Sequence, residues 1–126
     1  MSVIMRAQFS AEMIAAFEGT KYLYIRSGEH RFIAIWVVVV DGRVIVRSWN
    51  DKRAGWYRAF LEEPRGHVRL DGREVPIKAI PVRSKKLNEA ALAAYAAKYS
   101  TKANAKYVEG FAEERRVATT LELVPR

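Results

Sequence analysis

Two Asp-Gly pairs, at positions 41–42 and 71–72, restrict the fold of this chain more than any other feature. Each pair stands between short runs that are rich in β-branched and aromatic residues. An Asp-Gly pair in such a setting is typical of the tight turn of a β-hairpin. The chain is therefore expected to contain a mainly antiparallel sheet.

The residue runs around these turns predict six strands. The almost wholly apolar run 33–40 indicates a central strand that is buried on both faces, and Trp36 within it is expected to belong to the core. Pro76 and Pro81 place their strand at an edge or at a bulge of the sheet, since proline cannot donate to a ladder. The six predicted strands are 21–27, 32–40, 43–49, 67–70, 74–82 and 118–124.

Helical periodicity appears in three places. Ser10 can cap a helix over 11–18 within an N-terminal segment 1–19, and a second helix is expected over 53–63 because Pro64 ends it. A longer helical segment follows at 86–111, and Asn88 or Ser84 can cap its start. We expect one α+β domain over residues 1–126, in which residues 20–83 form the main part of a six-stranded split β-barrel with short helices at its corners.

Composition excludes several classes of protein. The 126 residues are 50% hydrophobic, so a packed core is expected and disorder is not. There is no cysteine and only two histidines occur, which argues against a metal site and against a thiolate nucleophile. The longest apolar run is too short to span a bilayer, and the N-terminus does not resemble a signal peptide, so a cytoplasmic location is expected.

The positive charge is concentrated in the middle of the chain. The formal net charge is +8, and residues 41–86 contain twelve Lys or Arg against six Asp or Glu. This excess favours an anionic partner, which is either nucleic acid or a small phosphorylated ligand. Solvent alone is the remaining alternative.

A basic corner at residues 50–53 is the best place for such an anion. Asn50 or Asp51 can cap a helix that starts near Arg53, and the first turn of a helix offers unpaired N–H groups. Lys52 and Arg53 would add charge-assisted hydrogen bonds to a phosphate held there. The alternative is a capped connection whose charges face water.

The order of motifs resembles the deazaflavin-dependent nitroreductase family, within the FMN-binding split β-barrel group, and most of all its small uncharacterised bacterial relatives. The resemblance runs from about Tyr22 to Pro125. The residues that carry it are Asp41-Gly42, Ser48, Lys52, Trp56-Tyr57-Arg58, Glu63-Pro64, Gly72-Arg73 and Pro81-Val82.

The resemblance implies an FMN or deazaflavin coenzyme that is held at Ser48, Lys52, Arg53 and Trp56. To this set we add Arg47, a strand arginine that can face a phosphate, and Trp49, which can line a slot for the ring. Two departures from the family pattern affect this corner. The loop before Trp56 is about two residues shorter than usual, and Trp49 stands where close backbone approach favours glycine.

Tyrosines at 95, 99 and 107 recur near helical spacing, which by itself indicates a packing stripe. The resemblance implies that tyrosines of this region close over the substrate side of the coenzyme, and Tyr99 and Tyr107 are therefore candidate proton donors. If the chain follows the FMN branch, a homodimer would complete each site.

We therefore expect a flavin- or deazaflavin-binding protein that, if it is an enzyme, transfers hydride to a small organic acceptor. A nucleic-acid-binding module is the first rival, with Trp49 or Tyr57 stacking on bases. A scaffold that has kept the fold without a coenzyme is the second rival.

Overall fold

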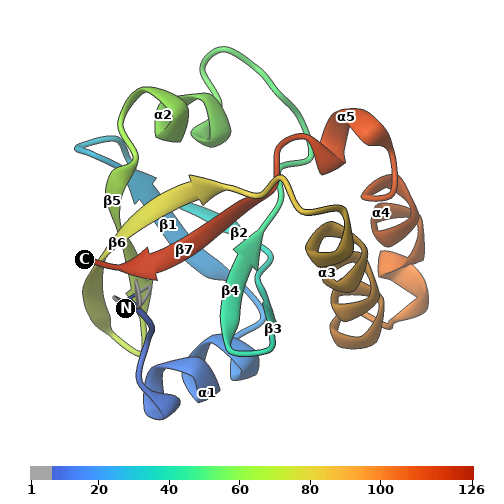
Figure 1. Cartoon of the computed structure of the whole chain (residues 1–126), viewed down its shortest axis with the longest axis horizontal. Coiled ribbons are helices and arrows are strands. Elements are labelled where there is room, and N and C mark those ends of the chain that lie inside the picture. Colours follow the sequence, from blue (N-terminus) through green and yellow to red (C-terminus); the bar gives the residue numbers. More distant parts are fainter. Residues whose placement is uncertain (1–6) are drawn as a thin grey trace, which may run out of the picture.

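The computed structural model describes residues 7–126, and it confirms the α+β fold with a curled antiparallel sheet (Figure 1). The first six residues of the predicted N-terminal segment lie outside the described residues. The strands are β1 (Leu23–Ser27), β2 (Ile33–Ile35), β3 (Val38–Val40), β4 (Arg43–Val46), β5 (Arg65–Leu70), β6 (Arg73–Pro81) and β7 (Leu121–Pro125). The helices are α1 (Ala11–Gly19), α2 (Trp56–Glu62), α3 (Lys85–Lys98), α4 (Ala105–Gly110) and α5 (Glu114–Val117), with a 3-10 turn at Lys102–Asn104.

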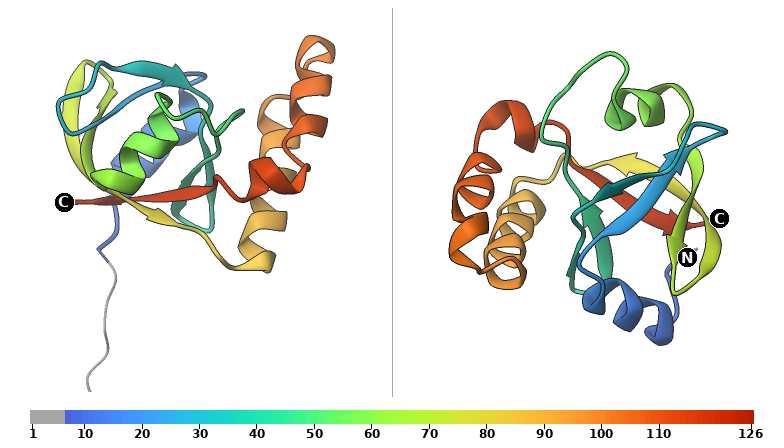
Figure 2. Two further views of the ribbon diagram at one scale, coloured as in Figure 1. Left: turned by 90° about the horizontal axis from the view of Figure 1, so that it is seen from above. Right: turned by 180° about the vertical axis from the view of Figure 1, so that it is seen from behind.

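All seven strands belong to one sheet, in the order β2-β1-β5-β6-β7-β4-β3, and every neighbouring pair is antiparallel. The two edge strands, β2 and β3, follow each other in the chain with only Trp36 and Val37 between them. Since one short segment supplies both edges, the sheet has to curl on itself, and Figure 2 shows this curled half-barrel from two further sides.

The predicted central strand over 33–40 is wrong, and its division explains the seventh strand. The chain bends at Trp36 and Val37, so Ile33–Ile35 pairs with β1 whereas Val38–Val40 pairs with β4. Two other strands are buried on both sides instead: β4, where Val44, Ile45 and Val46 are all fully buried, and β7, where residues 121–124 are all buried. Both halves of the run are apolar because each packs against a core: helices α1 and α3 cover β3, whereas Ile33 and Ile35 of β2 pack against the barrel interior.

Both predicted hairpin turns are confirmed. Asp41 and Gly42 have φ angles of 48° and 76°, and Asp71 and Gly72 have φ angles of 49° and 73°. Positive φ at both turn residues is the geometry that matches the twist of antiparallel strands. The pairs Val40↔Arg43 and Leu70↔Arg73 close the two hairpins.

The prediction that prolines place the strand after Asp71-Gly72 at an edge or a bulge is wrong, since β6 is continuous and lies between β5 and β7. Pro76 lies opposite His67 of β5, one residue before the pairing with β7 begins at Ile77. Pro81 lies opposite Leu121 of β7, beyond the end of the pairing with β5 at Lys78. Each proline therefore stands where β6 has one neighbour, and the missing N–H does not interrupt a ladder.

Two hydrophobic clusters lie on opposite sides of β4. The barrel interior is the larger cluster, and helices α1 and α2 contribute Phe17 and Phe60 to it. The helical seam is the cluster between the sheet and α3 with α4, whose buried members are Val38, Ile45, Leu87, Ala91, Tyr95, Tyr99 and Phe111. In Figure 1, α3, α4 and α5 lie together on one side of the sheet, which leaves the seam between these helices and β4.

Helix caps follow the prediction in two places. The side-chain oxygen of Ser10 accepts from the Met13 N–H at the start of α1, and that of Ser84 accepts from the Leu87 N–H at the start of α3. Over residues 7–126, no helix is both long and apolar enough to cross a membrane.

Candidate functional site

An aromatic slot opens where β2 and the end of β4 meet α2 and α4. It has a volume of about 320 Å³, and residues from five parts of the chain line it. Half of its lining residues are aromatic: Tyr22, Trp36, Trp49, Trp56, Tyr107 and Phe111. The slot also contacts Ser48 and Asn50, which follow β4 directly. Predominantly apolar walls with a few polar groups are typical of small-molecule sites.

Trp36 forms the back of the slot rather than part of a closed core. Its ring stacks on Tyr99 with 4.0 Å between centroids and an angle of 6°. Phe111 and Tyr107 approach it edge-on, at 6.0 Å and 6.4 Å. The ring is thus held from the seam side, while the residue stays half-buried and lines the slot. It occupies the bend between β2 and β3, which the sequence pattern does not reveal.

Trp49 lies at the mouth of the slot with 39% of its surface exposed. The Arg116 guanidinium carbon stands 3.4 Å from the centre of its ring, and Arg116 Nε donates to the Trp49 carbonyl at 2.7 Å. A Cβ added to Gly110 would lie 2.4 Å from this ring. The family pattern favours glycine at position 49, but here the close approach is made possible by Gly110, which contacts the Trp49 ring.

Arg47 is fully buried at the end of β4. Its guanidinium donates to Thr120 Oγ1 at 2.8 Å, to the Phe111 carbonyl at 2.7 Å, and to the carbonyl and Oδ1 of Asn88 at 3.2 and 3.3 Å. These bonds tie β4 to α3, to the end of α4 and to the start of β7. Burial lowers the pKa of Arg47 from its ordinary value, yet an arginine stays protonated in proteins.

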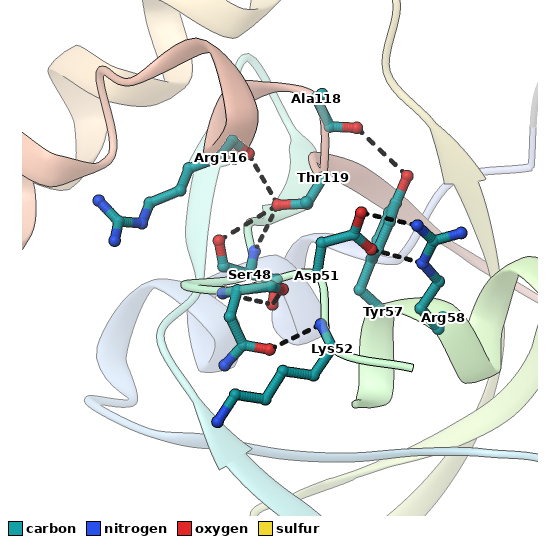
Figure 3. A network of polar contacts seen from close by, with 9 residues as sticks. Ser48, Asp51, Lys52, Tyr57, Arg58, Arg116, Ala118 and Thr119 are labelled. Atoms are coloured by element: carbon teal, nitrogen blue, oxygen red, sulfur yellow. Dashed lines mark hydrogen bonds and ion pairs between the residues drawn. The ribbon is translucent and has the colours of Figure 1, made fainter. Parts of the chain in front are cut away.

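Ser48 ties the end of β4 to the segment before β7 (Figure 3). Its backbone N–H donates to Thr119 Oγ1 at 3.0 Å, and Thr119 Oγ1 donates to the Arg116 carbonyl at 2.7 Å. The Ser48 hydroxyl donates to the Asn50 carbonyl, which turns the chain into the loop. Ser48 is buried, so it contributes mainly to the shape of the slot floor.

The predicted helix start at Arg53, with Asn50 or Asp51 as its cap, is wrong. Helix α2 begins at Trp56 and Gly55 is its N-cap, without a side-chain bond. Both candidate caps are used elsewhere: Asn50 Oδ1 accepts from the Lys52 N–H at 3.0 Å, and the Asp51 carboxylate binds Arg58 at 2.6 and 2.8 Å. The basic corner is therefore a loop.

The two cations of this loop lie in different places. Lys52 lines a hollow that it shares with Trp56, whereas Arg53 lines a separate hollow with Asp51, Arg58 and Glu62. Figure 3 shows the Lys52 side chain extending away from the Asp51–Arg58 pair. Lys52 and Arg53 therefore lie at different hollows, although they are neighbours in the sequence.

The hollow beside Lys52 forms a basic slot of about 260 Å³, whose cationic lining residues are Arg26, Arg31 and Lys52. Arg26 is engaged with Glu29 and Glu74, at 4.0 and 3.8 Å. Within residues 7–126, neither Arg31 nor Lys52 forms an ion pair. Two cations are thus available to a ligand.

The basic slot adjoins the aromatic slot. Ile33, Asn50 and Trp56 line both of them. A ligand with a flat apolar part and an anionic part would find a complementary surface for each part in these two neighbouring slots.

The two candidate tyrosines differ in their surroundings. Tyr99 is buried, and its hydroxyl donates to the Lys21 carbonyl at 2.6 Å and accepts from the Val37 N–H at 3.1 Å. Burial raises the pKa of Tyr99 to about 12. Tyr107 lies on α4 with 42% of its surface exposed and lines the aromatic slot. Only Tyr107 is accessible to a ligand there.

Five of the eight residues predicted for the site meet at the aromatic slot: Arg47, Ser48, Trp49, Trp56 and Tyr107. Lys52 lies at the adjoining basic slot, whereas Arg53 and Tyr99 line neither. The prediction omitted Trp36, Asn50 and Arg31. A signal for Trp36 was present, since it is the only aromatic residue within the aliphatic run 33–40. No group of three or more His, Cys, Asp or Glu that could hold a metal occurs among the described residues.

Comparison with solved structures shows where this fold has been seen. The crystal structure of the conserved hypothetical protein Rv2991 from Mycobacterium tuberculosis aligns with a TM-score of 0.60 and 13% identity, over 100% of this chain and 86% of that chain. A FAD-binding protein (mll6688) from Mesorhizobium loti aligns with a TM-score of 0.49 and 13% identity, over 91% and 87%. At such low identity the first likeness shows a common fold.

Comparison with curated proteins finds no match. A family model does match, over residues 14–123, and it is described as an uncharacterized protein conserved in bacteria (DUF2255). The matched range includes β1 to β6, all the helices after α1, and both slots. The chain therefore belongs to the DUF2255 family.

Proposed function

We propose that this protein binds a flavin or deazaflavin coenzyme, with the flat ring in the aromatic slot and the phosphate-bearing chain in the basic slot. One observation carries the proposal: an apolar slot lined by aromatic rings shares three lining residues with a second slot, where two cations form no ion pair within residues 7–126. The resemblance to the deazaflavin-dependent nitroreductase family supports the choice of coenzyme, because it places binding at the same end of β4.

The aromatic slot suits a planar heterocycle in size and chemistry. Its volume of about 320 Å³ lies in the range of ligand pockets, roughly 300 to 1,000 Å³. Tryptophan and tyrosine faces provide stacking area. The side-chain NH2 group of Asn50, which lines the slot and makes no hydrogen bond to the described residues, can orient the polar edge of a ring.

The basic slot suits a phosphate through side-chain charge. Arg31 offers a planar fork of donors and Lys52 a point charge, and both bind phosphate oxygens well when no carboxylate competes. A helix dipole plays no part in this proposal, because α2 begins beyond the loop.

When bound, the coenzyme would supply hydride transfer to a small organic acceptor. The residues of the chain would bind and orient it and exclude water from one face of the ring. We assign Tyr107 as the residue that donates a proton to the acceptor, since its ring lies at the exposed side of the slot.

The test is a titration of the protein with FMN and with a deazaflavin coenzyme, followed by tryptophan quenching and ligand absorbance. Lys52→Ala should weaken binding by about tenfold, because a charge-assisted hydrogen bond contributes about 1.5 to 3 kcal/mol. Arg53→Ala is the matched control, since it removes the same charge from the neighbouring residue that lines a different hollow. It should change affinity by less than about twofold.

Riboflavin, which lacks the phosphate, separates the two slots. Lys52→Ala should leave riboflavin affinity unchanged within about twofold, because surface charge far from the ring contributes little. Equal losses for Lys52→Ala and Arg53→Ala would show that only overall charge matters, and absence of binding by any of the three ligands would reject the proposal.

A second candidate function is binding of single-stranded nucleic acid. The half-exposed Trp49 ring lies among Lys52, Arg115 and Arg116, which line one hollow with it, and an exposed ring between cations can stack on a base. Oligonucleotide binding with a steep dependence on salt, without coenzyme binding, would favour this candidate.

A further inference from the structure

Arg47 is a buried positive charge without an acidic partner. Only 2% of its surface is exposed, and no carboxylate among residues 7–126 forms an ion pair with it. All four of its hydrogen bonds go to neutral oxygens, from Thr120, Phe111 and Asn88. Buried charges are normally paired, because removing an isolated charge from water is costly.

The nearby groups that could neutralise this charge do not do so. Burial raises the pKa of Tyr95, so its phenol stays neutral beside the guanidinium. The Glu122 carboxylate on β7 binds Arg43 at 2.7 Å, and that of Glu113 binds Arg115 and Arg116. The positive charge of Arg47 is therefore not compensated by any carboxylate of residues 7–126.

Arg47 also retains a donor. A guanidinium carries five N–H groups, and four bonds are made: one by Nε, one by Nη1 and two by Nη2. One N–H of Nη1 has no partner among the described residues. Arg47 lines the aromatic slot, so a slot ligand is the group that could meet both the donor and the charge.

We propose that the aromatic slot selects planar aromatic ligands that carry a negative charge on the edge of the ring system, and that Arg47 determines this specificity. The inference deepens the proposed function and rests on it for the position of the ring. A charge in a desolvated site interacts more strongly than one at the surface, because less water screens it. In a flavin or deazaflavin, the charge would lie on the pyrimidine part of the ring, which is the part that ionises.

A matched pair of probes tests the inference: 2-naphthoate and 2-naphthamide, which share a ring system and nearly the same shape but differ in charge. Affinities are measured by quenching of tryptophan fluorescence and by calorimetry. The parent protein should prefer the anion by about tenfold, which corresponds to about 1.4 kcal/mol. Because Arg47 is buried, the preference should persist in about 0.5 M salt, where surface attraction is screened.

Three variants identify the residue responsible. Arg47→Gln keeps a side-chain donor and removes the charge, so it should abolish the preference, whereas Arg47→Lys should keep most of it. The double variant Arg31→Ala with Lys52→Ala removes the exposed cations of the basic slot and should leave the preference intact. If Arg47→Gln does not fold, the salt dependence of the parent and the double variant still decide the question.

Several results would overturn the inference: equal affinities for the two probes, a preference that disappears in high salt or in the double variant, a preference that survives in Arg47→Gln, or no binding of either probe at millimolar concentration. Failure of the proposed function looks different. In that case no coenzyme binds, yet the parent still prefers 2-naphthoate over 2-naphthamide.

Discussion

The barrel interior and the helical seam lie on the two sides of β4 and differ in the side chains that fill them. The buried members of the barrel interior are aliphatic apart from two phenylalanines, Phe17 and Phe60. The helical seam contains Tyr95, Tyr99 and Phe111, and Arg47 is buried beside it. Alternation along β4 produces this division, because Val44 and Val46 face the interior while Ile45 faces α3.

The different compositions of the two clusters imply that the barrel interior contributes mainly to stability and the helical seam mainly to ligand binding. Aliphatic packing is non-directional and stabilises through buried area. The seam instead relies on directed hydrogen bonds, such as those of Arg47 and Tyr99, and it continues into the aromatic slot. We therefore expect changes in the interior to lower stability and changes at the slot to alter binding with a smaller loss of stability.

The largest expected effect is in the interior. Phe17 is fully buried and packs against Phe9 with 4.9 Å between ring centroids. Phe17→Ala should lower the free energy of unfolding by about 3 to 5 kcal/mol, since it removes a buried ring and leaves a cavity. Urea denaturation measures this. Tyr107→Ala is the control from the slot, and its half-exposed ring should cost less than about 1 kcal/mol. Equal losses would remove the distinction between the two regions.

An intermediate effect is expected where α4 meets Trp49. Gly110→Ala would place a Cβ 2.4 Å from the Trp49 ring and 2.9 Å from Arg116 Nη1. The ring must move, which should cost about 2 kcal/mol and weaken binding of ring ligands. Tryptophan fluorescence and a naphthoate titration detect both changes. Gly19→Ala is the control, because nothing lies within 4 Å of its Cβ position. An unshifted fluorescence spectrum in Gly110→Ala would contradict the stacking geometry.

The smallest effect concerns Lys98, which joins the two regions. Its ammonium donates to the carbonyls of Phe17, at 3.0 Å, and Val37, at 2.7 Å. Burial lowers the pKa of Lys98 from 10.5 to about 8. Between these values the unfolded chain binds more protons than the folded one, so stability from this group should rise as the pH increases from about 8.

Because Lys98 is only half-buried, screening by solvent should reduce the rise to about 1 kcal/mol. The measurement compares the urea midpoint of the parent protein with that of Lys98→Met at several pH values. The variant should lack this rise. Parallel curves for the two proteins would show that Lys98 has an ordinary pKa in the folded state.

Much of the fold could be predicted because the informative signals are local. The two Asp-Gly turns and the Ser10 and Ser84 caps depend on residues within a few positions, and all are confirmed. The errors have a common origin. The run 33–40 was assigned to the centre of the sheet because apolar composition indicates burial but does not say which element provides it.

Part of the candidate site was also predictable from local sequence signals. The residues that follow β4 in sequence, Ser48 and Trp49, line the slot because a strand end leads directly into it. The prediction that Asp51 caps the helix was wrong because its carboxylate binds Arg58, seven residues later. A cap pattern in the sequence does not show whether the capping side chain will bind a more distant donor instead.

The sequence by itself determined the hairpins, the caps of α1 and α3, the antiparallel class of the sheet and the basic character of the corner after β4, since each follows from short-range backbone preference or from composition. Only the tertiary structure decided that one bent segment supplies both edges of the sheet, that Lys52 and Arg53 line different hollows, and that the charge of Arg47 is buried against neutral oxygens. These features depend on contacts between residues that are far apart in the sequence. Packing around β4 determines those contacts, and the identity of neighbouring residues does not.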